Sequence, residues 1–129
     1  MKKAFSLFMF LILMSGIKSA KAQKAYDFIT YRTTIYGDQT TLQLADGYLL
    51  ASKITIRSKI GNQEFEPSSA EADDQGDLRF DAVKGTGRYK ENKGSWLTVK
   101  NLNGAEYPSM LKAIYWDGKM QKTFIFKRQ

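Results

Sequence analysis

The stretch that decides the fold reads ADGYLLASKITIRSKIGN and spans residues 45–62. Two sets of side chains alternate along it. One parity carries Tyr48, Leu50, Ser52, Ile54, Ile56, Ser58 and Ile60, and the other carries Leu49, Ala51, Lys53, Thr55, Arg57 and Lys59. Alternation with a period of two is typical of a β-strand with one face in the core and one in water. The stretch therefore predicts a half-buried strand directly after the Asp46-Gly47 turn.

The rest of the chain repeats this pattern of β-rich runs separated by turn dipeptides. The runs cover residues 26–36, 40–45, 63–67, 78–83, 95–102, 110–116 and 119–128. The turn signals are Gly37-Asp38, Asp46-Gly47, Gly61-Asn62, Asn103-Gly104 and Asp117-Gly118. This spacing predicts an all-β fold of about eight strands, either a single small antiparallel β-barrel or a sandwich. Pairing of the first strand with the last would close a barrel and remove its exposed edges.

Two polar segments, residues 68–77 and 84–94, interrupt the strands and are expected to be loops. The second contains Gly85-x-Gly87 among basic residues. Backbone amides of a glycine turn can hold an anion, and a solvated loop is the alternative reading.

The N-terminal segment has the pattern of an export signal. Two lysines precede an apolar run at residues 4–14, and Ala20-Lys21-Ala22 follows. This predicts a secretory signal peptide at residues 1–22 and a single β domain at residues 23–129. The run is shorter than the roughly 20 residues of a membrane-spanning helix, so no transmembrane segment is expected after signal removal. The expected location is periplasmic or extracellular.

The absence of cysteine and histidine excludes several classes of chemistry. Without cysteine there is neither a disulfide nor an N-terminal lipid anchor, so the protein is not expected to be a lipoprotein. Without histidine or cysteine the commonest general base, thiol nucleophile and transition-metal ligands are missing. We therefore expect a protein that is not an enzyme and that uses no cofactor.

The net charge of +7 overstates how basic the domain is. Four of the 20 basic residues lie in the predicted signal peptide, which leaves 16 basic residues against 13 acidic ones. This small excess keeps a protein soluble, and it does not indicate a nucleic-acid partner.

Three groups of residues are candidates for binding. Trp96 and Trp116 could stack on a sugar or contact a partner if they are exposed, or they could pack in the core. Ser52 and Ser58 share the apolar face of the opening strand and could mark a partly wet lumen. The row Lys53, Arg57 and Lys59 on its polar face could dock on an anionic surface such as lipid head groups, or keep the strand from aggregating.

The acidic residues offer weaker candidates. Glu71, Asp73 and Asp77 loosely follow the start of a calcium loop, but the twelfth position is Ala82, where calcium requires a bidentate carboxylate. A solvated acidic turn is the alternative. Glu64 and Glu66 share a strand face, as a carboxylate-dependent hydrolase would require.

The inward side chains are expected to be bulky. They are Leu42, Leu44, Tyr48, Leu50, Ile54, Ile56, Ile60, Leu78 and Phe80. An eight-stranded barrel has room inside for such side chains or for one small ligand. A domain of this size without disulfides needs them as its core.

The layout resembles a type of short secreted β protein found in the Bacteroidota. The resemblance is carried by Ala22-Gln23, Tyr26-Asp27-Phe28, Ile54-Thr55-Ile56, Gly76-Asp77 with Phe80, Trp96, and residues 124–128. The layout also resembles small lipocalin-like barrels. Neither resemblance implies a role for a particular residue.

The sequence therefore predicts an exported, non-enzymatic binding or interaction domain. Its partner would be a protein, a glycan or a small apolar molecule. A barrel that carries an apolar ligand in its lumen is one alternative, and a hydrolase of cell-envelope glycans is the other.

Overall fold

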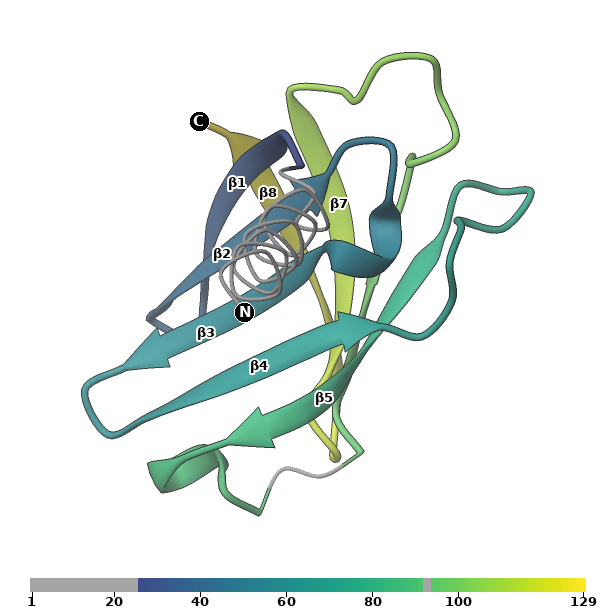
Figure 1. Ribbon diagram of the computed structural model, residues 1–129. Helices are drawn as coiled ribbons and strands as arrows, with labels where there is room; N and C mark the ends of the chain where they lie inside the picture. Colours follow the sequence, from purple (N-terminus) through teal and green to yellow (C-terminus); the bar gives the residue numbers. More distant parts are fainter. Residues whose placement is uncertain (1–25, 92–93) are drawn as a thin grey trace, which may run out of the picture.

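The protein is an eight-stranded antiparallel β-barrel (Figure 1). The computed structural model describes residues 26–91 and 94–129, so the predicted signal peptide lies outside the described residues. The strands are β1 (Phe28–Ile35), β2 (Asp38–Ala45), β3 (Lys53–Ser58), β4 (Gly61–Pro67), β5 (Leu78–Gly85), β6 (Trp96–Val99), β7 (Met110–Trp116) and β8 (Gln121–Arg128). Each strand pairs with the next, and β8 pairs with β1. The prediction of a small all-β fold is confirmed, and the fold is the barrel rather than the sandwich.

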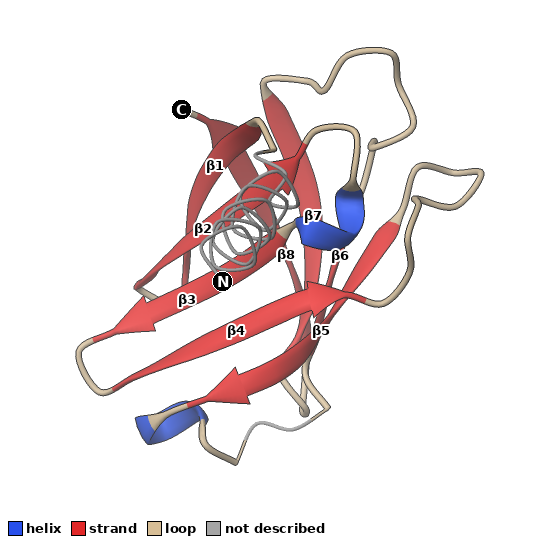
Figure 2. Cartoon of the chain, in the orientation of Figure 1, coloured by secondary structure: helices blue, strands red, loops and turns tan. Residues whose placement is uncertain are grey.

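Two 3-10 helices interrupt the strands, η1 (Leu49–Ala51) and η2 (Gly87–Tyr89). Both contact β4, and Figure 2 shows them near its opposite ends. Neither they nor any other helix in the described part of the chain has the length and apolar character needed to cross a bilayer.

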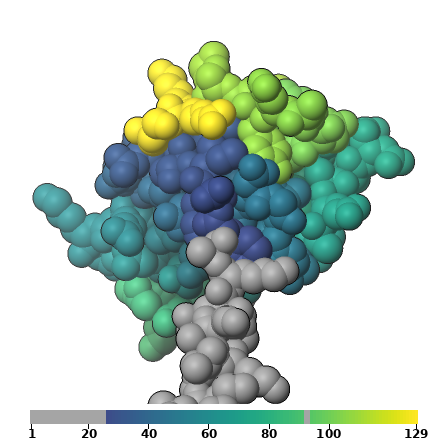
Figure 3. Space-filling view, turned by 45° about the horizontal axis from the view of Figure 1, so that its top comes forward, coloured from purple at the N-terminus to yellow at the C-terminus, as the bar shows by residue number. Residues whose placement is uncertain are grey.

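The seam between β1 and β8 is much shorter than the other strand pairings. It consists of Tyr31 opposite Arg128 and Arg32 opposite Lys127, although both strands have eight residues. Figure 3 shows the last residues of the chain, in yellow, against the purple residues of β1. From this contact the two strands diverge toward their other ends (Figure 1). The barrel is therefore closed at one end of the seam and parted at the other.

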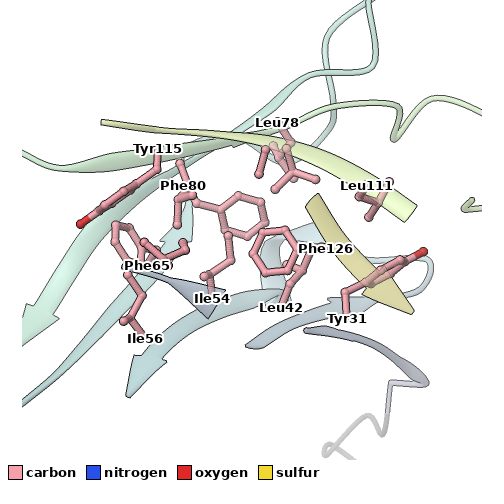
Figure 4. Close-up of a cluster of buried hydrophobic side chains, with 14 of the residues drawn as sticks. Tyr31, Leu42, Ile54, Ile56, Phe65, Leu78, Phe80, Leu111, Tyr115 and Phe126 are labelled. Atoms are coloured by element: carbon pink, nitrogen blue, oxygen red, sulfur yellow. The ribbon is translucent and has the colours of Figure 1, made fainter. Parts of the chain in front are cut away.

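The interior is filled by side chains (Figure 4). Residues from all eight strands are completely buried, and the largest are Tyr31, Phe65, Phe80, Phe126, Leu42, Leu44, Ile54, Ile56, Leu78, Leu97 and Leu111. The Tyr31 hydroxyl donates a hydrogen bond to the carbonyl of Pro108, 2.7 Å away, and so ties β1 to the loop before β7. Burial of this set supplies the main free energy of folding.

The prediction that Tyr48, Leu50 and Ile60 point inward is wrong. Their side chains are 44%, 41% and 63% exposed. The chain does not enter a strand after the Asp46-Gly47 turn, because residues 48–52 wind into η1 and β3 starts only at Lys53. The winding lets Leu49, on the opposite parity, pack against the core.

Three predicted turns are also misplaced. The turn between β1 and β2 consists of Tyr36 and Gly37, and Asp38 already belongs to β2. The turn between β3 and β4 falls at Lys59 and Ile60, before Gly61-Asn62, and this is why Ile60 lies in solvent. Asn103-Gly104 does not join two strands directly, because it lies in a long connection between β6 and β7. Leu102 in that connection is buried, and its N–H donates to the carbonyl of Gly76 at 2.9 Å.

Within the segment at residues 84–94, the described stretch 84–91 is more ordered than a solvated loop. A β-bulge shifts the register between β4 and β5 next to Glu64 and Phe65. Gln63 is buried at this point, and its Nε2 donates to the carbonyls of Glu64 and Lys84 at 3.1 and 2.8 Å. A bulge bends its strand, and here the bent β5 leads into η2.

We predict that Ser52→Ala destabilises the protein by about 1–3 kcal/mol, because it leaves a buried N–H without an acceptor. The Ser52 hydroxyl accepts the N–H of Ala45 at 2.9 Å. Ser58→Ala is the matched control. Its hydroxyl lies in the partly exposed β3–β4 turn, so the loss should be about 1 kcal/mol or less. Urea unfolding measures both, and equal losses would contradict the buried role of Ser52.

Candidate functional site

The two tryptophans are neighbours on the outside of the barrel. Trp96 in β6 and Trp116 in β7 are direct partners across the strands, and both are half-buried. The Arg79 guanidinium lies 5.1 Å from the centre of the Trp96 ring, and its Nε donates to Asp81 at 2.7 Å. The structure therefore brings the two predicted residues together, with Arg79 over one of them.

The two serines do not form a wet lumen. Ser52 is buried against the backbone of Ala45. The Ser58 hydroxyl donates to the carbonyl of Gly61 at 3.0 Å and accepts the N–H of Ile60 at 3.2 Å. These hydrogen bonds hold the turns at the two ends of β3.

The basic row is divided between a strand and a turn. Lys53 and Arg57 point outward from β3, and Lys59 is exposed in the β3–β4 turn. Lys53 Nζ lies 4.0 Å from a carboxylate oxygen of Glu64 on β4. Glu66 is exposed on the same outer face of that strand.

Two carboxylates of the acidic loop, those of Asp73 and Asp77, have partners within the protein. The Asp73 carboxylate accepts the N–H groups of Gln75 and Asp77, both at 2.9 Å. The Asp77 carboxylate pairs with Lys100 Nζ at 3.2 Å. Across residues 26–91 and 94–129, no three acidic side chains form a group that could hold a metal ion. Glu71 is exposed.

A cavity that the sequence did not indicate lies where β1 and β8 part. Its volume is about 260 Å³, and it is lined by Ile35, Tyr36, Arg88, Tyr89, Tyr115, Asp117 and Lys119. These residues come from the end of β1, from η2, from the end of β7 and from the β7–β8 turn. We call this region the barrel mouth. Strand ends of small barrels are common places for ligand sites.

One wall of the mouth is locked by a polar triad. Arg88 donates to the Asp38 carboxylate at 2.7 Å and to the Tyr89 hydroxyl at 3.0 Å, and that hydroxyl donates to the same carboxylate. The Arg88 guanidinium also lies 4.8 Å from the centre of the Tyr89 ring. Arg88 thereby balances the charge of Asp38, and the hydrogen bonds hold the Tyr89 side chain, which is buried at the end of the barrel.

The backbone of η2 is fixed to the β3–β4 turn. The Arg88 N–H donates to the carbonyl of Ile60 at 3.0 Å, and the Thr86 N–H donates to that of Asn62 at 2.8 Å. Gly87 has φ +58°, and a Cβ at this position would lie 1.8 Å from the Ile60 oxygen. Only glycine allows this close approach, so Gly87 positions Arg88 and Tyr89.

The opposite wall is aromatic. The Tyr36 ring centre lies 6.3 Å from that of Tyr115 and 5.8 Å from that of Phe124. Lys122 Nζ lies 5.3 Å from the Tyr36 ring centre and 5.8 Å from the Phe124 ring centre. Offset and edge contacts of this kind, with a cation over the rings, form a rigid rim that is partly open to water.

Burial determines the protonation state of the tyrosines that line the mouth. Burial raises the pKa of Tyr89 to about 12, and its hydrogen bond to Asp38 acts in the same direction. Burial also raises the pKa of Tyr115 to about 12, with smaller contributions from Tyr89 and Asp117. Hydrogen bonds from the N–H groups of Met120 and Lys119 lower the pKa of Asp117. At neutral pH the mouth therefore presents neutral tyrosines and a charged, backbone-bound aspartate.

Sequence reasoning missed this site because its lining residues come from three distant stretches of the chain, at 35–36, 88–89 and 115–119. One signal was present: Tyr89 is a large aromatic residue inside a polar, glycine-containing segment. Such a residue has to pack somewhere, and here it covers the end of the core.

We predict that the free energy of unfolding falls as the pH rises from about 10 toward about 12. The folded protein holds the protons of Tyr89 and Tyr115 above the ordinary tyrosine pKa of 10.0, so their stabilising effect is complete below pH 10.0 and is lost above it. Urea unfolding at several pH values measures the slope. Tyr89→Phe should make it shallower, and an unchanged slope would contradict the prediction.

Comparison with protein-family models, with curated proteins and with solved structures finds no match for this chain. A functional interpretation therefore depends on the chemistry of the residues described above.

Proposed function

We propose that the protein is an exported, non-enzymatic binding domain that holds a small ligand at the barrel mouth. The observation that carries this proposal is a cavity with aromatic walls, lined by Lys119 and flanked by Lys122 over the Tyr36 ring, where the seam between β1 and β8 ends. Export follows from the N-terminal sequence pattern.

The charges of the mouth indicate the chemistry of the ligand. Asp38 is already paired with Arg88, and Asp117 is bound by backbone N–H groups. Neither Lys119 nor Lys122 forms a salt bridge among the described residues, although the Lys119 charge acts on the nearby Asp117 carboxylate. They are therefore available to an anionic group of a ligand, while Tyr36 and Tyr115 can contact a flat ring.

The size of the mouth limits the ligand further. Its volume of about 260 Å³ is slightly below that of ordinary ligand pockets, which start at roughly 300 Å³. We therefore expect a small ring-bearing acid, such as an aromatic or sugar carboxylate or phosphate. Because the mouth is open to solvent, a larger molecule could also bind by inserting one end into it.

The filled core favours the mouth over the lumen as the binding place. A barrel that carries an apolar ligand needs free space in its interior. In this barrel the inward positions hold completely buried aromatic and aliphatic side chains. Glu64 and Glu66, the carboxylates that a hydrolase would use, point outward from β4. Both alternatives have less support than the mouth.

The backbone of Tyr36 gives independent support. Tyr36 and Gly37 form the two-residue β1–β2 turn, with φ 50° and 84°. Such a turn favours asparagine or glycine, and a bulky residue at positive φ is strained. Strained residues cluster at functional sites, where the side chain is needed more than a relaxed backbone.

The first test is native mass spectrometry of the protein purified in folded form from the cells that make it. We expect an added mass that disappears on denaturation. Lys122→Gln should reduce the occupied fraction, because it removes the cation that lies over the Tyr36 ring at the edge of the mouth. Lys112→Gln is the matched control, since it removes the same charge from the outer face of β7. Equal occupancy in the two variants would contradict binding at the mouth.

The second test uses the strained turn. Tyr36→Asn should abolish binding yet change the free energy of unfolding by no more than about 1 kcal/mol, because relief of backbone strain offsets the lost ring contacts. Tyr48→Asn, at an exposed tyrosine beside η1, should leave the bound mass in place. Retention of the ligand by Tyr36→Asn would move the site elsewhere.

A glycan or protein partner at Trp96 and Trp116 is the second candidate function. Their direct pairing on the outer face favours it, because two adjacent tryptophans offer a large apolar contact. Arg79 and Asp81 cover part of Trp96, so we rank this surface below the mouth.

A further inference from the structure

A second surface, unrelated to the mouth, runs over the outside of five neighbouring strands. In β7, β8, β1, β2 and β3, all of which are described in full, every charged side chain on the outer face is a cation. These cations are Lys112, Lys127, Arg32, Lys53 and Arg57. We call this surface the basic face. It extends the row that the sequence indicated on β3 across the seam to β7.

The strongest signal on the basic face is a pair of like charges. Arg32 and Lys127 are direct partners in the short seam between β1 and β8. Neither has a carboxylate partner among the described residues. Like charges directly opposite each other destabilise a strand pair. The chain nevertheless places them at the contact that closes the barrel, where an external anion would relieve the repulsion.

Apolar side chains are also exposed on β1, β7 and β8. Phe28, Met110 and Ile125 are 49%, 56% and 43% exposed. Met110 lies opposite Lys127, and Ile125 lies opposite Lys112. Exposed apolar residues set among cations are typical of a surface that lies on an anionic membrane.

The acidic side chains on the outer faces of the strands lie on the other side of the ring, whereas Asp46 and Glu106 lie in loops beside Ile29 and Arg128. Glu64 and Glu66 are on β4, Asp81 is on β5, and the acidic loop joins these two strands. In a closed ring of eight strands, β4 and β5 lie farthest from β8 and β1. The outer faces of the strands therefore differ in charge: β7, β8, β1, β2 and β3 carry only cations, whereas β4 and β5 together carry charges of both signs. An anionic surface would orient the molecule with the seam inward.

We infer that the basic face docks on a bilayer surface that contains anionic phospholipids. Lys127 and Arg32 contact the phosphate groups, and Ile125, Met110 and Phe28 enter the headgroup boundary. The binding is peripheral and depends on salt, because exposed charges carry most of it. It does not depend on a ligand at the mouth.

The test is co-sedimentation of the protein with phosphatidylcholine vesicles that contain phosphatidylglycerol, with pure phosphatidylcholine vesicles as the reference. We expect binding only when phosphatidylglycerol is present, and loss of binding at high salt. Each cation removed from the basic face should weaken binding about fivefold. The double variant Arg32→Gln with Lys127→Gln should therefore bind far more weakly.

Lys84→Gln with Lys90→Gln is the matched control, because it removes the same charge from β5 and the residue after η2. It should bind nearly as well as the unaltered protein. Lys127→Glu adds a stability readout that does not depend on vesicles. It should raise the urea midpoint by removing the repulsion at the seam, while it abolishes vesicle binding.

Three results would overturn the inference. The first is equal binding to the two kinds of vesicle, and the second is equal binding by the two double variants. The third is binding to dextran sulfate but not to vesicles, which would assign the face to a soluble polyanion. Ile125→Ser distinguishes a membrane from a soluble polyanion, because it should weaken binding to vesicles and leave binding to dextran sulfate unchanged. Tyr36→Asn should leave vesicle binding unchanged, so failure of the mouth proposal and failure of this one are distinguishable.

Discussion

Two residue pairs, Tyr31 with Arg128 and Arg32 with Lys127, close the ring of eight strands. Without them β1 and β8 would each present a row of unpaired backbone groups, which invites pairing with other chains. Tyr31 and Phe126 are completely buried beside the seam, so the same contact also covers the core. Because the pairing ends after two residues, the remaining length of the seam has to be closed by side chains. Tyr36, Phe124 and Tyr115 do this, and η2 completes the closure.

The closure decides where function can lie. A barrel of eight short strands has an interior that side chains can fill, and in this protein they do. A ligand or partner can then bind only outside the core. The candidate places are the gap between β1 and β8 and the outer surface that combines cations with exposed apolar side chains. The parted end of the seam combines rings with cations, and the closed end combines opposed cations with exposed apolar side chains. Both sites result from the same short contact between the first strand and the last.

Most of the fold could be predicted from the sequence, because alternation and turn dipeptides are local signals. Leu42, Ile54 and Phe80 point inward as expected. The errors arise where tertiary packing prevails over alternation. Residues 48–52 continue the period of two, yet they wind into η1 because Ser52 can bind the Ala45 N–H and Leu49 can then reach the core. The mouth could not be predicted, since Asp38, Arg88 and Tyr115 meet only after the barrel closes. The pairing of Trp96 with Trp116 also depends on a register that no single strand reveals.

Residue-resolved hydrogen exchange tests the central claim most directly. The Gln129 N–H donates to the carbonyl of Thr30, so alternation along β8 points the N–H groups of Lys127, Ile125 and Thr123 toward β1. If the seam ends after Arg32 and Lys127, the Lys127 amide is protected, and those of Ile125 and Thr123 exchange quickly. The amides of Phe124 and Phe126, which face β7, should be protected throughout. Slow exchange at Ile125 and Thr123, equal to that of Phe124 and Phe126, would show a fully paired seam and contradict a mouth between parted strands.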